Sequence, residues 1–86
     1  MPAEVTNVPI VLTSLMGHLE RIAAADPDRQ LTAYQREGFN WVLGHSRAKF
    51  SDARLQRIEP IAAPEAPSVG ETLERLRAVA EVVLEG

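Results

Sequence analysis

The C-terminal quarter of this sequence carries its most regular pattern, which admits a helix and little else. Apolar residues recur there at alternating intervals of three and four, a heptad-like seam about two heptads long. The seam consists of Leu73, Leu76, Ala80 and Val83, and Val79 and Val82 widen it. Ser68 and Glu71 stand just before it with the S/T-x-x-E/Q spacing of a capping box. We therefore predict an amphipathic helix over residues 68–85.

A proline-rich link, PIAAPEAP at residues 60–67, separates this helix from the rest of the chain. Proline fixes its backbone φ angle and lacks an N–H, so three prolines in eight residues leave no room for a helix. We expect an extended, rather stiff segment. Ile61 is the one large apolar residue in the link, and we expect it to reach the core.

A first helix is predicted over residues 9–25, preceded by an N-terminal tail at 1–8. Its apolar positions again follow the spacing of an amphipathic helix. They are Leu12, Leu15, Met16, Leu19, Ile22 and Ala23. Asn7 is a suitable N-cap, and Pro9 suits the first turn, where no N–H is needed. Asp26-Pro27-Asp28 ends the helix, because a residue before proline avoids the α conformation.

A second helix is predicted from Thr32 to about Ala48. Thr32 and Gln35 form another capping-box pair. Two neighbouring stripes follow: Phe39, Val42, Leu43 and Phe50 form one, and Tyr34, Gly38, Trp41 and His45 form the other. Because these stripes together cover more than half of the helix circumference, we expect this helix to be the most buried of all.

A short third helix is predicted over residues 52–59, with Ser51-Asp52 as its start and Pro60 as its end. Leu55 and Ile58 are expected to point inward. The fold class is therefore all-α: a small bundle of three core helices plus a C-terminal amphipathic helix after the proline-rich link. The 86 residues suffice for a single helical domain.

Composition excludes several classes of function. The chain has no cysteine, which removes disulfides, thiolate metal sites and cysteine nucleophiles. The net charge of −3 disfavours a general nucleic-acid binder. The longest apolar run, residues 8–12, is far shorter than the ~20 residues that span a bilayer. The start of the chain lacks the basic and apolar regions of a signal peptide. We therefore expect a cytoplasmic protein with no membrane partner.

No catalytic constellation can be identified. The titratable candidates are His18, His45, Glu20, Glu37 and Asp52. A nucleophile needs a base, and the base needs an orienting partner, yet the spacing of these residues predicts no such group. Two histidines on different helices also make a poor metal site. We expect no enzyme activity, no cofactor and no metal.

One stretch resembles a motif of a known family. LTAYQREGFNWVL is similar to the segment L-x-x-Y-Q-x-x-G-x-x-W that precedes the P-loop of Swi/Snf-type helicases, in which the Gln reads adenine. The matching residues are Leu31, Tyr34, Gln35, Gly38 and Trp41. The P-loop that should follow is replaced by GHSRAKFSDARL. Without that phosphate-binding loop, the resemblance implies no nucleotide-binding role for this chain.

A basic cluster suggests one alternative function. Arg47, Lys49, Arg54 and Arg57 gather within eleven residues and are candidate contacts for nucleic acid or for an acidic partner. If Gly44 ended the second helix, residues 44–46 would be the turn of a helix-turn-helix around residues 33–58. The chain would then be a dimeric, sequence-specific DNA-binding regulator. Ser51-Asp52 is the better helix start, however, and it favours a basic rim instead.

The function we favour is a small non-enzymatic module that binds another protein or a second copy of itself, such as an adaptor, inhibitor, antitoxin-like regulator or accessory subunit. The seam of Leu73, Leu76, Ala80 and Val83 is the predicted binding surface, since a short chain has difficulty in hiding it alone. The alternative for the seam is intramolecular: the last helix packs back and completes the bundle.

Overall fold

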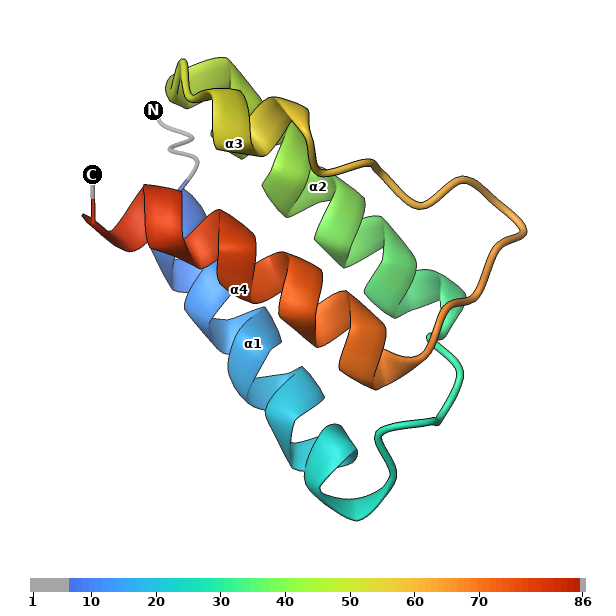
Figure 1. Ribbon diagram of the computed structural model, residues 1–86. Helices are drawn as coiled ribbons and strands as arrows, with labels where there is room; N and C mark the ends of the chain where they lie inside the picture. The colour runs from blue at the N-terminus through green and yellow to red at the C-terminus, as the bar shows by residue number, and fades with distance from the viewer. Residues whose placement is uncertain (1–6, 86) are drawn as a thin grey trace, which may run out of the picture.

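The computed structural model describes residues 7–85, and this part of the chain is all-α (Figure 1). Its helices are α1 (Val8–Ala25), α2 (Ala33–Lys49), α3 (Ala53–Gln56) and α4 (Val69–Glu85). Three of them are long, and all four pack together without a strand in the described range. The predicted fold class is therefore confirmed. No helix in that range has the length and hydropathy needed to cross a bilayer.

Helix α1 begins as its sequence indicates, with one difference. The backbone N–H of Ile10 donates to the Asn7 side chain at 3.3 Å, so Asn7 is the N-cap. Val8 is already helical and fully buried, which corrects the assignment of residues 7 and 8 to a tail. The first helical residue is therefore already part of the core, and burial of its apolar side chain stabilises this start of the helix. The rest of the predicted tail, 1–6, lies outside the described residues.

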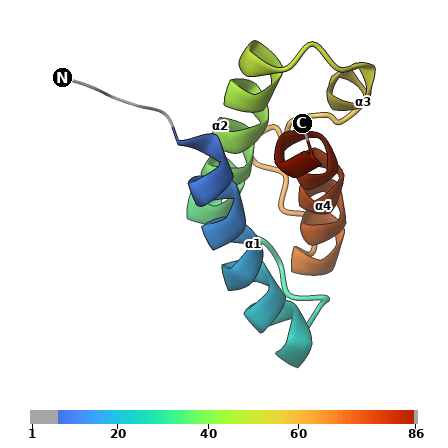
Figure 2. The same ribbon diagram turned by 90° about the vertical axis from the view of Figure 1, so that its left-hand side faces the viewer.

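The three long helices form the body of the bundle. α1 runs opposite to α2 and α4, as both ribbon views show (Figures 1 and 2). α4 makes its most extensive contacts with α1 and also packs against α2 and α3. α3 lies beside the last turns of α2, at the end of the molecule where α4 finishes (Figures 1 and 2).

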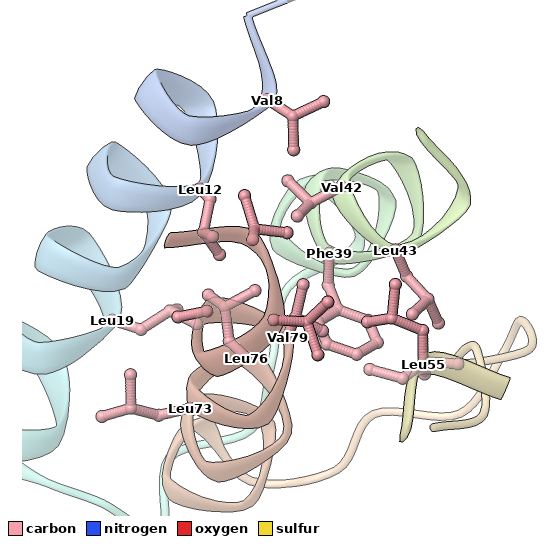
Figure 3. Close-up of a cluster of buried hydrophobic side chains, with 14 of the residues drawn as sticks. Val8, Leu12, Leu19, Phe39, Val42, Leu43, Leu55, Leu73, Leu76 and Val79 are labelled. Atoms are coloured by element: carbon pink, nitrogen blue, oxygen red, sulfur yellow. The ribbon is translucent and has the colours of Figure 1, made fainter. Parts of the chain in front are cut away.

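The core lies between the helices, and every helix contributes to it. Figure 3 shows the side chains of α1, α2, α3 and α4 converging on one another. The largest fully buried ones include Leu12, Leu19, Phe39, Leu43, Leu55, Ile61 and Leu76. α4 contributes the most buried positions, because its valines and leucines cover two adjoining stripes. Burial of this apolar surface is the main driving force for the fold.

The proline-rich link is held against α2 by a two-way contact with Asn40. The backbone N–H of Ile61 donates to the Asn40 carbonyl oxygen, and the Asn40 amide donates to the Ile61 carbonyl, both at 2.8 Å. The Asn40 side chain therefore pairs with the link as a neighbouring backbone would. Ile61 is buried beside this contact, which confirms its predicted place in the core.

A second set of backbone hydrogen bonds joins the loop after α1 to the start of α4. Leu31 N–H donates to the Pro67 carbonyl at 2.9 Å, and Val69 N–H donates to the Arg29 carbonyl at 2.7 Å. Gly70 N–H donates to the Pro27 carbonyl at 2.9 Å. A Cβ on Gly70 would lie only 3.1 Å from that oxygen. Glycine is therefore the residue that lets α4 begin so close to the loop.

Helix α2 continues through Gly44 and ends at Lys49, one residue beyond the predicted end. α3 is shorter than predicted, four residues in place of residues 52–59. Leu55 is fully buried and Ile58 is partly buried, so both point inward as expected. A helix of one turn has few hydrogen bonds of its own, and its position depends on Leu55 and on side chains that hold its ends.

Candidate functional site

A mostly apolar groove lies between α1 and α2. Its lining residues are Val11, Ser14, Leu15, His18, Tyr34, Glu37, Gly38 and Trp41. Its volume is about 480 Å³. We call these eight residues the α1–α2 groove. Tyr34 keeps 85% of its surface exposed and Trp41 keeps 39%, although both are aromatic. The groove is the candidate functional site.

The spacing of the lining residues follows from two antiparallel helices. On α1 the lining falls at Val11, Leu15 and His18, and on α2 at Tyr34, Gly38 and Trp41. Residues separated by four and then three positions lie along one edge of a helix. Leu15 and Gly38 meet in the middle, where a Cβ added to Gly38 would lie 3.7 Å from a Leu15 methyl group.

Polar contacts around Gln35 lie next to one end of the groove, where His18 is a lining residue. The Thr32 hydroxyl accepts the backbone N–H of Gln35 at 3.1 Å, and the Gln35 side-chain oxygen accepts the backbone N–H of Thr32 at 2.9 Å. The predicted capping box is therefore present. The Gln35 side-chain nitrogen lies 3.0 Å from Nε2 of His18 on α1. This contact ties the start of α2 to the middle of α1.

At the other end, Trp41 stacks on a histidine one turn later. The ring centroids of Trp41 and His45 lie 4.2 Å apart, with the planes tilted by 42°. The imidazole supports one side of the indole and holds it at the groove, which suits an aromatic side chain that keeps a large exposed surface. The indole ring is therefore positioned before any ligand arrives.

The groove suits binding better than chemistry. Its lining is mostly apolar, and Glu37 is its single carboxylate. No group of three or more His, Asp or Glu side chains within 7–85 lies close enough to hold a metal ion. The exposed aromatic rings and the hollow at Gly38 present surface that an apolar side chain of another molecule can cover.

The sequence prediction for this face was wrong in one respect. Tyr34, Gly38, Trp41 and His45 were expected to be buried with the rest of α2, but Tyr34, Trp41 and His45 are exposed and Gly38 is half-buried. The core stripe of α2 consists of Gln35, Phe39, Val42, Leu43 and Ser46. The second stripe lies at the edge of α2 that faces α1, where no third helix covers it. In a small chain, a helix that carries two apolar stripes indicates that one of them lies on an uncovered face.

The apolar seam of α4 that was predicted to bind a partner lies in the core of the chain and not on its surface. Leu73, Leu76, Ala80 and Val83 are buried within the single chain, with at most 8% of any of them exposed. They pack against the other helices, chiefly α1 (Figure 3). A partner would reach them only if α4 left the bundle. α4 therefore packs back onto its own chain and completes the bundle, which was the alternative that the sequence left open.

Two members of the basic cluster bind groups of their own chain. The Arg47 guanidinium donates to the carbonyls of Leu55, at 3.1 Å, and Ile58. Arg54 forms an ion pair with Asp52 at 2.9 Å. Lys49 and Arg57 are exposed. The cluster is therefore spread over α2 and α3 rather than presented by one helix.

The geometry predicted for a helix-turn-helix is absent from this region. Residues 44–46 are helical and lie inside α2, so they form no turn. Residues 47–57, which would form the recognition helix after that turn, are divided between the end of α2, an extended segment around Phe50 and the single turn of α3. α2 continues past Gly44 to Lys49, and Phe50 is its C-cap.

The helicase-like residues also have structural roles. Leu31 is buried in the core, and Gln35 is buried between the Thr32 cap and His18. Neither polar atom of the Gln35 amide is free to read a base. Tyr34 and Trp41 line the α1–α2 groove instead.

A scan against protein-family models, a search of curated proteins and a search of solved structures each found no match.

Proposed function

We propose that this chain is a small non-enzymatic protein–protein interaction module, in the manner of an adaptor, inhibitor, antitoxin-like regulator or accessory subunit. Its partner binds at the α1–α2 groove. The observation that carries this proposal is the exposure of Tyr34 and Trp41 beside an apolar groove, in a chain that buries its other apolar stripes.

Energetics supports a binding role for these two rings. Aromatic side chains bury more apolar area than other residues, so leaving them in water forgoes a large gain in free energy. Tyr and Trp are also the residues that contribute most often to the centres of protein interfaces. The stacking of Trp41 on His45 reduces the ordering that binding would require.

The scarcity of charged residues in the groove also favours this face as a binding surface. Glu37 is the only Asp, Glu, Lys or Arg in the lining of the groove, although these residues make up 24% of the chain. Depletion of charge is typical of the centre of an interface, because each charge there must lose its hydration. The remaining polar groups of the lining, Ser14 and His18, can donate or accept a hydrogen bond at the rim.

The test compares groove variants with a matched control. Tyr34→Ser and Trp41→Ser remove exposed rings, and Leu84→Ser removes an apolar side chain that is 55% exposed on α4, outside the groove. Each chain is used as bait in extract from its native cells, and the retained proteins are quantified. We expect a partner that is retained by the parent chain and by Leu84→Ser and is lost with both groove variants.

The interaction is then measured directly with the purified partner. Trp41 is the only tryptophan of the chain, so its emission reports on the groove itself. Its burial by a partner shifts the emission to shorter wavelength. Circular dichroism of each variant checks that the helices are intact. Equal retention by the parent chain and by both groove variants would overturn the assignment of the groove.

A further inference from the structure

Glu37 is an exposed carboxylate in the lining of the α1–α2 groove. The ion pairs that form within residues 7–85 lie elsewhere in the fold. Its neighbours three and four positions away on α2 are Ala33, Tyr34, Asn40 and Trp41. None of these is basic, so α2 supplies no cation to Glu37. The α1 side of the lining contains no Lys or Arg either. Glu37 therefore forms no ion pair within the described part of the chain.

Two aromatic rings flank this carboxylate along the same edge of α2. Tyr34 precedes Glu37 by three positions and Trp41 follows it by four, and all three side chains line the groove. Helical side chains lean toward the N-terminus of their helix, so the indole of Trp41 reaches back over the turn that holds Glu37. His45 approaches the same indole from the following turn, with the ring centroids 4.2 Å apart. The part of the indole nearer Glu37 is therefore left for a ligand.

The carboxylate and the two rings attract the same kind of group. The face of an aromatic ring carries the negative part of its quadrupole and attracts cations, most strongly for Trp. Glu37 adds a full negative charge, and no Lys or Arg of the lining opposes it. The net charge of −3 on the chain acts in the same direction. The groove is therefore electrostatically complementary to a cation on an apolar stem, and it disfavours an anion.

We infer that the partner bound at the α1–α2 groove presents an arginine, flanked by apolar side chains, whose guanidinium pairs with Glu37 and stacks on Trp41. The inference rests on the proposed function and names the chemistry of the partner. A planar guanidinium can donate two hydrogen bonds to a carboxylate and can also stack on an aromatic ring, whereas the ammonium of lysine is a compact, strongly hydrated charge. The aliphatic stem of the arginine covers apolar surface, such as the ring of Tyr34.

The groove is large enough for an arginine together with its apolar neighbours. Its volume is about 480 Å³. Its α1 edge extends from Val11 to His18, a length of ~10 Å at ~1.5 Å per residue, which corresponds to about two turns of a helical segment. Leu15 lies against Gly38 in the middle of the groove and offers apolar surface there. Apolar side chains on either side of the arginine can cover Val11 and Leu15, as in other segments that dock in a groove.

The first experiment titrates the full chain with three probes that carry different head groups on the same apolar stem: n-hexylguanidinium, n-hexylammonium and hexanoate. The emission of Trp41, the only tryptophan, reports binding in the groove. We expect saturable binding of hexylguanidinium at roughly millimolar concentration, weaker binding of hexylammonium and no saturable response to hexanoate.

The same titration is repeated with charge variants. Glu37→Gln should weaken the binding of hexylguanidinium by about fivefold, because the ion pair is lost. Glu81→Gln is the matched control, since it removes the same charge at an exposed position of α4 outside the groove, and it should bind like the parent chain. Circular dichroism checks that each variant keeps its helices. Equal affinity of the parent chain and Glu37→Gln, or equal binding of hexanoate and hexylguanidinium, would overturn the inference.

The second experiment returns to extract from the native cells and compares the proteins retained by charge-reversed baits. In Glu37→Lys an ammonium group replaces the carboxylate, so it repels the guanidinium of the partner. We expect the partner retained by the parent chain to be reduced with Glu37→Gln and lost with Glu37→Lys. Glu81→Lys makes the same change of net charge outside the groove and should retain the partner. Full retention of a groove-dependent partner by Glu37→Lys would contradict the assigned arginine.

These outcomes separate the inference from the function on which it rests. A partner that is lost with Tyr34→Ser and Trp41→Ser but retained by Glu37→Lys would contradict the arginine and support the interaction module. Binding of hexylguanidinium without any protein that depends on the groove would contradict the proposed function and a protein source of the cation. Such a result would make the groove a site for a small organic cation. No binding of the probe and no groove-dependent partner would contradict both proposals.

Discussion

The side-chain nitrogen of Gln35 lies 3.0 Å from Nε2 of His18, while the oxygen of the same amide accepts the backbone N–H of Thr32. The capping box fixes the orientation of the amide, because a reversed amide would point its NH₂ group at the N–H of Thr32. The group that faces His18 is therefore a donor. Nε2 of His18 is therefore the acceptor of this hydrogen bond, which in a neutral ring places the proton on Nδ1.

This arrangement predicts the tautomer of His18 and the effect of changing Gln35. Nitrogen chemical shifts should identify Nδ1 as the protonated nitrogen of His18 in the neutral ring. Gln35→Ala removes one bond to the cap and one to the imidazole, so we expect the free energy of unfolding to fall by about 1–2 kcal/mol in urea denaturation. Gln35→Glu retains an oxygen for Thr32 and should lose less. Equal losses in both variants would contradict a capping role for the side chain.

A second prediction concerns the buried seam of α4. Leu76 is fully buried, so Leu76→Ala should lower the free energy of unfolding by about 2–5 kcal/mol through lost burial and a residual cavity. Leu84 is exposed on the same helix, and Leu84→Ala should change stability by no more than about 0.5 kcal/mol. Chemical denaturation of the two variants measures both values. Similar, small effects at the two positions would mean that α4 leaves the bundle in solution.

A third prediction concerns Arg47. Its guanidinium donates to the carbonyls of Leu55 and Ile58 and so holds the C-terminal end of α3. Arg47→Met retains the aliphatic part and loses both bonds, and we expect stability to fall by about 1–3 kcal/mol. Arg47→Lys has a single ammonium group in place of the planar fork and should recover part of the loss. Lys49→Met, at an exposed position, is the control, and equal stability of the two methionine variants would show that Arg47 has no structural role.

A fourth prediction concerns pH. The guanidinium and the backbone N–H of Arg54 both donate to the Asp52 carboxylate, and these bonds hold the pKa of Asp52 below its ordinary value of 3.8. A carboxyl group with a depressed pKa in the folded state binds its proton more readily when unfolded, so its contribution to stability is present above the unfolded value. That contribution is lost as the pH falls from about 4 through the folded pKa.

The measurement compares the parent chain with Asp52→Asn in urea denaturation at several pH values from 6 to 2.5. Asparagine still caps α3 but forms no ion pair. The stability difference between the two chains should be largest at pH 6 and should shrink below pH 4. In Arg54→Gln the carboxylate has lost its partner, and the same acid-dependent difference should be reduced. A difference that stays constant down to pH 2.5 would contradict the depressed pKa.

A fifth prediction contrasts two glycines. A Cβ at Gly44 would have no atom outside its own helix within 4 Å, so Gly44→Ala should stabilise α2 by up to about 1 kcal/mol through helix propensity. At Gly70 the Cβ would press on the Pro27 carbonyl, which is held by its bond from Gly70 N–H. We expect Gly70→Ala to lower the melting temperature and Gly44→Ala to raise it. A rise in both variants would show that the loop at Pro27 yields easily.

The sequence by itself determined the three long helices and, to within one residue, their ends, but it overestimated the length of α3. Asn7, Thr32 and Ser68 accept the hydrogen bonds expected of caps, and the prolines interrupt the chain where helices stop. These features are local, because a cap or a break depends on residues within one turn. The continuation of α2 through Gly44 was also predicted from the better helix start that follows it.

Only the tertiary structure decided which apolar stripes are covered. The seam of α4 and the stripe of Tyr34 and Trp41 both have helical periodicity, yet the first is buried and the second lines an open groove. Periodicity shows that a stripe exists on a helix, but its burial depends on which helices lie beside it. α4 packs against all three other helices, whereas α1 and α2 have an outer side that no further helix of residues 7–85 covers.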